Sequence, residues 1–124
     1  MIVDDEPIIV EGLSRSIAWE KWNCEVAVTA NDGLEGKQLI EEKKPDIVFM
    51  DICMPEMDGL VAAHQMRQTK RTGAQVIPMI AMTANDSIED IHVCKEAGMN
   101  DHVAKPVEPQ KLYQVLCEYL HEIA

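Results

Sequence analysis

Short apolar runs rich in β-branched residues alternate with longer segments of helical periodicity along the whole chain. The runs predict strands at Ile2–Val3, Glu25–Thr29, Asp46–Met50, Val76–Met82 and His102–Ala104. Consecutive parallel strands need a crossover connection, usually a helix, and helices on both faces bury a parallel sheet. The alternation therefore predicts an α/β fold: a doubly wound, five-stranded parallel sheet with helices on both faces.

The segments between the runs are predicted to be amphipathic helices. They cover Pro7–Trp19, Asp32–Lys44, Asp58–Thr69, Asp86–Ala97 and Pro109–Ile123. Asp86 or Ser87 is expected to cap the fourth helix, and Gly98 is expected to end it. Pro109 suits the first turn of the fifth helix.

The chain has 124 residues, 47% of them hydrophobic, which fits a single domain spanning residues 1–124. No apolar run is long enough to cross a bilayer, so we expect no membrane insertion, and no secretion signal is visible. The four cysteines form no CxxC pair, which favours reduced, mostly buried thiols in a cytoplasmic protein. The net charge of −11 argues against direct binding of nucleic acid and favours a cation or a basic partner.

Polar side chains follow four of the five predicted strands. These are Asp4, Asp5 and Glu6 after the first strand, Asp51 after the third, Thr83 after the fourth and Lys105 after the fifth. The carboxyl ends of parallel strands meet at one edge of the sheet, where open α/β sheets bind their ligands. We therefore expect carboxylates, a hydroxyl and an amine to converge at that edge.

Such a cluster limits the chemistry that is possible there. Clustered carboxylates repel one another, so positive charge has to lie among them. Lys105 supplies one charge, and a hard divalent cation with oxygen ligands is the natural second source. An open site with few protein ligands favours Mg²⁺, which keeps several waters. A carboxylate beside Mg²⁺, a lysine and a hydroxyl is equipped to attack a phosphoryl group and to form an aspartyl phosphate.

The motifs "VDDE", "VFMDICMPEMDG", "MTAN" and "AKP", in this order and spacing, resemble the CheY-like receiver domain of bacterial two-component response regulators. The resemblance covers the whole chain and implies a flavodoxin-like (βα)5 fold with strand order 2-1-3-4-5. It also implies a signalling switch that accepts a phosphoryl group from a phosphohistidine. The donor would be a histidine kinase or a histidine phosphotransfer domain.

The resemblance also implies a role for each acidic residue. Asp51 would be the phosphoacceptor. Asp5, Asp51 and the backbone carbonyl of Cys53 would bind Mg²⁺ directly, and Asp4 would hold a metal-bound water. The Lys105–Pro106 peptide bond is expected to be cis, as in the family.

The conformational response would involve Lys105, Thr83 and His102. Lys105 would pair with the acyl phosphate, and Thr83 would hydrogen-bond a phosphate oxygen and so report phosphorylation. The family often has Tyr or Phe where this chain has His102, and a histidine adds a possible charge near neutral pH. The surface of the fourth helix, fifth strand and fifth helix would then change, and it offers a face for a homodimer.

The sequence is compatible with two kinds of full-length protein that would contain this domain. The last third, with "VIPMIAMTAN" and "EAGMNDHVAKPVEPQKLYQVL", is similar to receivers of hybrid sensor histidine kinases, which favours that parent. The N-terminal half is similar to receivers of free-standing transcriptional regulators. In either parent the resemblance implies that this domain would be a switch that assists only its own phosphorylation and dephosphorylation, although a full hybrid chain would be a histidine kinase.

Two other functions compete with the switch. A Mg²⁺-dependent phosphohydrolase would also use Asp51 as nucleophile, but such enzymes usually have a second acidic residue where this chain has Cys53. An interaction domain would bind its partner without phosphorylation, which the acidic cluster argues against. In the receiver family, the side chains at Cys53 and Asn85 tune dephosphorylation, so we expect them to affect the lifetime of the phosphoryl group.

Overall fold

The strands form one parallel sheet in the order β2-β1-β3-β4-β5, as the resemblance implied. The computed structural model describes residues 1–52, 54, 59–68, 77–84 and 88–120. The strands are β1 (Ile2–Val3), β2 (Thr29–Ala30), β3 (Val48–Asp51), β4 (Met79–Thr83) and β5 (Asp101–Ala104). All neighbouring pairs run parallel, so the carboxyl ends of the strands share one edge.

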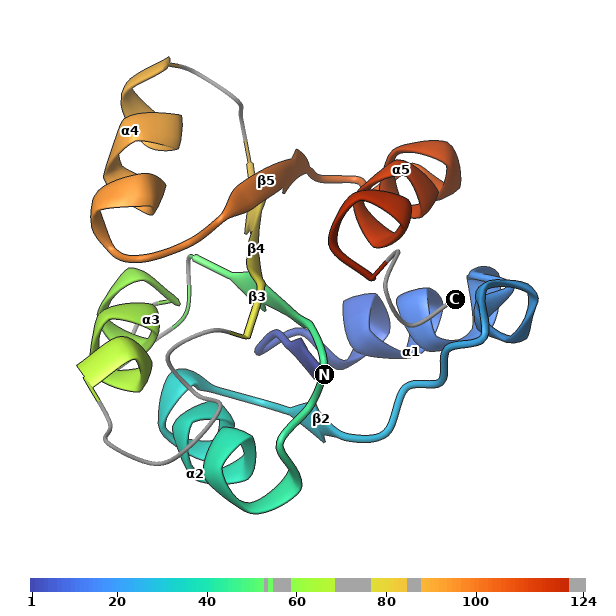
Figure 1. The fold of residues 1–124 in the computed structure, drawn as a ribbon, viewed down its shortest axis with the longest axis horizontal. Coiled ribbons are helices and arrows are strands. Elements are labelled where there is room, and N and C mark those ends of the chain that lie inside the picture. The colour runs from blue at the N-terminus through green and yellow to red at the C-terminus, as the bar shows by residue number, and fades with distance from the viewer. Residues whose placement is uncertain (53, 55–58, 69–76, 85–87, 121–124) are drawn as a thin grey trace.

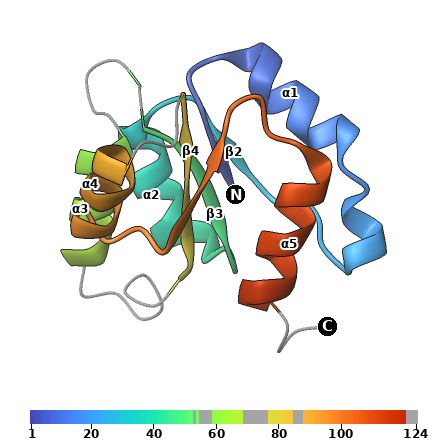
Figure 2. The same cartoon turned by 90° about the horizontal axis from the view of Figure 1, so that it is seen from above.

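Helices cover both faces of the sheet, which confirms the predicted doubly wound α/β architecture. They are α1 (Pro7–Ser16), α2 (Gly33–Lys43), α3 (Gly59–Gln68), α4 (Ile88–Glu96) and α5 (Pro109–Leu120), with a short 3-10 helix η1 (Trp19–Trp22). Figures 1 and 2 show α2, α3 and α4 on one side of the sheet and α1 and α5 on the other. None of the helices in the described part of the chain combines the length and apolar character that a bilayer crossing requires.

The central strands are apolar on both sides because each helical layer needs a surface to pack on. Val48 and Met50 of β3 belong to the core beneath α2, α3 and α4, whereas Phe49 between them belongs to the core beneath α1 and α5. In the second core the ring of Phe49 meets Trp19 of η1 edge to face, with centroids 6.4 Å apart. This two-sided burial explains the continuous apolar run before Asp51.

The second strand is shorter than predicted. Only Thr29 and Ala30 are paired, with Ile2 and Val3 of β1. Because β1 itself has only two residues, most of the segment before Thr29 has no strand of the sheet beside it. The prediction of Glu25–Thr29 followed the residue types, but a strand also requires a neighbour.

The first helix also ends earlier than predicted, at Ser16 rather than Trp19. Ile17, which follows the helix, has extended backbone angles, with φ −95° and ψ 132°. The indole Nε1 of Trp19 donates to the carbonyl of Leu13, in the last turn of the helix, at 3.1 Å. The other predicted bounds that fall on described residues hold within a few residues, and Gly98 follows α4 with φ +100° as expected of a helix end. The structure does not describe the predicted bounds at Asp58, Thr69, Val76, Asp86 and Ile123. The predicted caps Asp86 and Ser87 lie outside the described residues.

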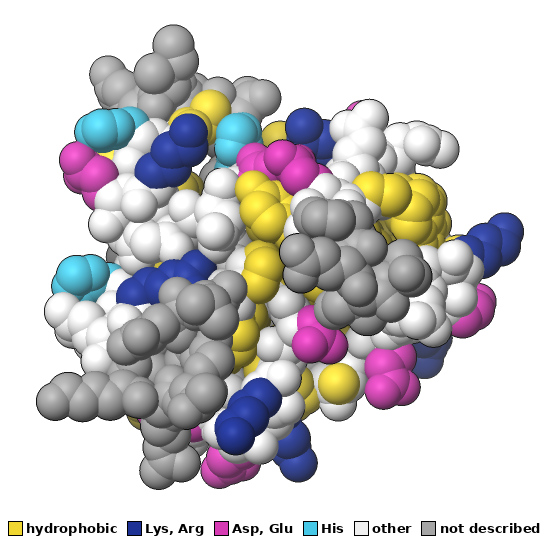
Figure 3. Space-filling model, in the orientation of Figure 1, with side chains coloured by type: hydrophobic (Ala, Val, Ile, Leu, Met, Phe, Trp, Pro, Cys, Tyr) yellow, Lys and Arg dark blue, Asp and Glu magenta, His cyan; other side chains and the backbone are white. Residues whose placement is uncertain are grey.

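The cysteines are less buried than predicted. Cys94 is buried, but Cys24 is only half-buried and Cys117 of α5 is exposed. In Figure 3, apolar side chains line the seam between the two helical layers, and charged side chains lie around it. A cavity of about 510 Å³ opens at the amino-terminal edge of the sheet, between Met1, Trp19 and Leu116.

Candidate functional site

The polar residues predicted at the strand ends do lie together. Asp51 is the last residue of β3 and Thr83 the last of β4, and Lys105 directly follows β5. The parallel register pairs Asp51 with Met82 and Thr83 with Ala104, which sets these ends side by side. The backbone N–H of Lys105 donates to the carbonyl of Thr83 at 2.7 Å, so the start of the next loop is tied to β4.

One ammonium group joins two buried carboxylates at this edge. Lys105 Nζ lies 2.9 Å from Asp4 Oδ2 and 3.1 Å from Asp51 Oδ2. Asp4 is 0% exposed and Asp51 is 4% exposed. Buried charges of this kind need a close partner, because the desolvation of a carboxylate is costly.

The two carboxylates also set the protonation of Lys105. Burial alone would lower the pKa of its ammonium, but the hydrogen bonds and charges of Asp4 and Asp51 outweigh burial and raise the pKa above its ordinary value. Lys105 therefore stays charged over the whole physiological range. The group is equipped to bind a further anion that enters the site.

Asp4 is held in place by the backbone around it. Its own N–H donates to the carbonyl of Ala30 at 3.1 Å, and its Oδ1 accepts from the N–H of Glu6 at 2.9 Å. The other oxygen is thereby left to face Lys105. The short turn from β1 into α1 thus fixes the first of the acidic side chains.

Four carboxylates lie close enough together to share a metal ion. Oxygens of Asp4, Asp5, Glu6 and Asp51 are all within 4.8 Å of one another. Hard divalent cations take oxygen ligands of this kind, so the residues fit Mg²⁺. Glu6 was not among the predicted ligands, although it is the third acid of "VDDE". The predicted carbonyl ligand, that of Cys53, lies outside the described residues.

Thr83 brings an unused polar atom to the same edge. Its side chain is 1% exposed, and Oγ1 has no hydrogen-bond partner among the described residues. A buried hydroxyl without a partner is costly unless a ligand supplies one. Thr83 therefore fits the predicted contact with a bound oxygen anion.

Gly59, the first residue of α3, approaches the end of β3 more closely than any side chain would permit. Its N–H donates to the carbonyl of Ile52 at 3.2 Å. A Cβ atom at this position would overlap the carbonyl oxygen of Asp51 and lie 2.8 Å from Ile52 Cα. The structure thus identifies the backbone of Asp51 and Ile52 as the close neighbour of Gly59.

His102 lies on β5 and is not part of the acidic cluster. It is half-buried, and its Nδ1 lies 3.6 Å from Asp101 Oδ1. Asp101 Oδ2 in turn accepts from the hydroxyl of Tyr119 on α5 at 3.3 Å.

The predicted cis bond between Lys105 and Pro106 is present. Asn85 lies outside the described residues.

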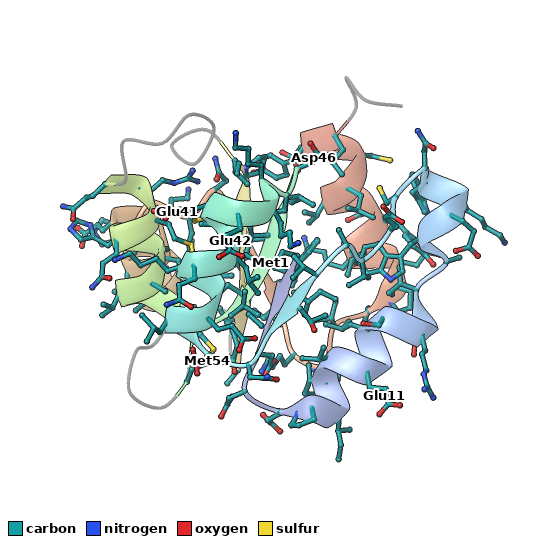
Figure 4. The ribbon with its side chains drawn as sticks, turned by 90° about the horizontal axis from the view of Figure 1, so that it is seen from below. Met1, Glu11, Glu41, Glu42, Asp46 and Met54 are labelled. Atoms are coloured by element: carbon teal, nitrogen blue, oxygen red, sulfur yellow. The ribbon has the colours of Figure 1, made fainter. Side chains whose placement is uncertain are left out.

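The acidic site is at the opposite end of the sheet from the cavity beside Met1, Trp19 and Leu116. Figure 4 shows Met54, which comes shortly after Asp51, at one edge and Asp46, which lines the cavity, at the other. The two features therefore share none of their residues.

Comparison with known proteins agrees with the fold and with the acidic edge, by which we mean Asp4, Asp5, Glu6 and Asp51 at the carboxyl ends of the strands. The family model "Response regulator receiver domain" matches residues 1–117. The chain is 35% identical over 106 residues to "Probable transcriptional regulatory protein TcrX" of Mycobacterium tuberculosis, covering 86% of this chain and 42% of TcrX. It is 33% identical over 112 residues to the response regulator MprA of Mycobacterium sp. (strain KMS), covering 90% of this chain and 46% of MprA. The chain thus spans about half the length of these relatives, which are named as regulators and not as hybrid kinases.

Solved structures give the same result. The REC domain of AraT, a response regulator from Geobacillus stearothermophilus, superposes with a TM-score of 0.84 at 33% identity, covering 98% of this chain and 92% of that one. The receiver domain of a sensor histidine kinase from Pseudomonas aeruginosa, solved with a magnesium ion in its active-site cleft, gives 0.79 at 28% identity, covering 97% and 94%. The chain belongs to the response regulator receiver domain family.

Proposed function

We propose that residues 1–124 form one receiver domain that accepts a phosphoryl group on Asp51 and so acts as a two-component switch. The observation that carries the proposal is the pair of buried carboxylates, Asp4 and Asp51, joined by the ammonium of Lys105. Receiver domains partner with histidine kinases, so the donor is a phosphohistidine on a kinase or phosphotransfer domain. A receiver domain is typically not a conventional enzyme, and this one acts only on itself.

The transfer is an in-line displacement at phosphorus. An oxygen of Asp51 attacks the phosphorus and forms a P–O bond while the P–N bond to the donor imidazole breaks. The imidazole nitrogen leaves with the bonding electron pair and takes a proton from solvent. Lys105 and Thr83 would hold the oxygens of the transferred group. Thr83 Oγ1, which has no hydrogen-bond partner within the described part of the chain, would then gain one.

Asp5 and Asp51 are the proposed direct ligands of Mg²⁺, together with the carbonyl of Cys53, and Asp4 is the proposed acceptor for a metal-bound water. When bound, the cation supplies positive charge that offsets the charge of the phosphoryl oxygens. Phosphorylation then shifts a two-state equilibrium at α4, β5 and α5 through Thr83 and His102. That face is also the one proposed for any homodimer.

Intact-mass analysis after incubation with Mg²⁺ and acetyl phosphate tests the proposal. We expect the wild type to gain one phosphoryl group and Asp51→Asn, which keeps the side-chain shape, to gain none. Chelation of Mg²⁺ is expected to abolish the gain on the wild type. A wild type that stays unmodified, or an equal gain in Asp51→Asn, would refute Asp51 as the acceptor.

A further inference from the structure

The structure adds Glu6 to the acidic edge. Glu6 is the N-cap residue of α1, and its side chain makes no capping hydrogen bond. One of its carboxylate oxygens instead lies within 4.8 Å of an oxygen from each of Asp4, Asp5 and Asp51. None of the roles proposed above involves the carboxylate of Glu6.

Negative charge exceeds positive charge at this edge. In the parts of the chain that the structure describes, four carboxylates gather there, and the ammonium of Lys105 contacts two of them, those of Asp4 and Asp51. A divalent cation would still leave a net negative charge. The buried hydroxyl of Thr83, which has no hydrogen-bond partner among the described residues, points independently to a ligand at the same edge.

We propose that Glu6 is a positioning residue of the cation site. Its carboxylate holds the cation through its charge and through metal-bound water, since Mg²⁺ keeps several waters when it binds to proteins. The same negative charge slows the reaction of anionic phosphodonors, because it repels them. This inference rests on the proposed function and adds a residue that tunes it.

The Glu6→Gln variant removes the charge and little else. The backbone N–H of Glu6, which donates to Asp4 Oδ1 at 2.9 Å, is unchanged by the substitution. Glu11→Gln is the matched control, because Glu11 lies on the outer side of α1 and pairs with Arg15 at 3.0 Å (Figure 4). Both variants lose one negative charge from the same segment, but only one loses it at the acidic edge.

Isothermal titration with Mg²⁺ measures the first effect. We expect the Kd for Mg²⁺ to rise about fivefold in Glu6→Gln and less than about twofold in Glu11→Gln, because Coulomb interactions weaken with distance and screening. The second readout is the initial rate of phosphorylation by acetyl phosphate at saturating Mg²⁺. We expect that rate to rise about twofold in Glu6→Gln, since the donor is an anion.

Weaker cation binding together with faster phosphorylation supports the role of Glu6, because a general loss of structure would slow the reaction. An unchanged Kd in Glu6→Gln, an equal rise in both variants, or a slower reaction overturns it. Failure of the proposed function looks different, since the wild type itself would then gain no phosphoryl group.

Discussion

Replacement of Gly59 by alanine tests how closely the start of α3 determines the position of Asp51. A Cβ atom on residue 59 would lie 2.8 Å from Ile52 Cα and 3.0 Å from the carbonyl carbon of Asp51. Carbon atoms in contact prefer separations of about 3.5–4.0 Å, so the backbone has to move apart by about 1 Å. All three neighbours are backbone atoms, so no side-chain rotation can relieve the overlap.

The expected effect on phosphorylation is large. A displacement of about 1 Å at a reacting group can lower the rate about a hundredfold. Overpacking of this kind also costs about 1–3 kcal/mol in the free energy of unfolding. We therefore expect Gly59→Ala to fold, with reduced stability, and to be phosphorylated by acetyl phosphate about a hundred times more slowly than the wild type.

Gly36→Ala is the matched control. Gly36 is also a buried glycine of a helix, but a Cβ there would meet side-chain atoms, with Val3 Cγ2 at 3.2 Å and Met66 Cε at 3.5 Å. Side chains can yield by a few tenths of an ångström, so we expect a smaller loss of stability and a nearly unchanged rate. Equal rate losses in the two variants, or a normal rate in Gly59→Ala, would refute the idea that residue 59 acts through Asp51. Urea denaturation supplies the stability of each variant.

Three further results are expected. Lys105→Met should lower the free energy of unfolding by about 3 kcal/mol in the presence of a chelator, because two buried carboxylates lose their partner. On the proposed function Mg²⁺ binds the folded state, so urea denaturation should show a smaller loss when Mg²⁺ is present. Asp32→Ala should cost about 1 kcal/mol in the same assay, because Asp32 Oδ1 caps α2 by accepting from the N–H of Glu35 at 2.8 Å. Burial, then the charges of Asp101 and Glu118, raise the pKa of Tyr119 to about 12. The folded chain therefore holds this proton more tightly than the unfolded chain, so stability present below about pH 10 is lost as the pH rises toward 12. The raised pKa of Lys105 acts in the same direction, and Tyr119→Phe should flatten the decline in a denaturation series measured against pH.

The sheet and the position of its polar edge were predictable because they depend on a pattern that burial imposes. Val48, Phe49 and Met50 are apolar without alternation since both faces of β3 are covered. A carboxylate directly after such a run can only lie at the edge of the sheet. The same argument placed Thr83 and Lys105, so the convergence of these groups followed from local sequence and parallel topology together.

Features that depend on a partner distant in the sequence were not predictable. The guanidinium of Arg67 on α3 donates to the carbonyl of Gly98 at 2.9 Å and to Asn100 Oδ1 at 2.7 Å. The sequence around Arg67 does not reveal these two hydrogen bonds, because a half-buried arginine and a fully exposed one look alike in a sequence.

The resting contacts of Lys105 explain how one added group could alter the whole carboxyl edge. The ammonium is shared between Asp4 and Asp51. The backbone N–H of Lys105 donates a hydrogen bond to the carbonyl of Thr83. The hydroxyl of Thr83 has no hydrogen-bond partner among the described residues. A phosphoryl group on Asp51 would compete with Asp4 for the ammonium and would offer an acceptor to Thr83. Both changes act on the ends of β4 and β5, and β5 leads directly into α5. On the proposed function, the response should therefore begin as an exchange of partners at Lys105 and Thr83. If so, Thr83→Ala should still be phosphorylated but should transmit little change to α5.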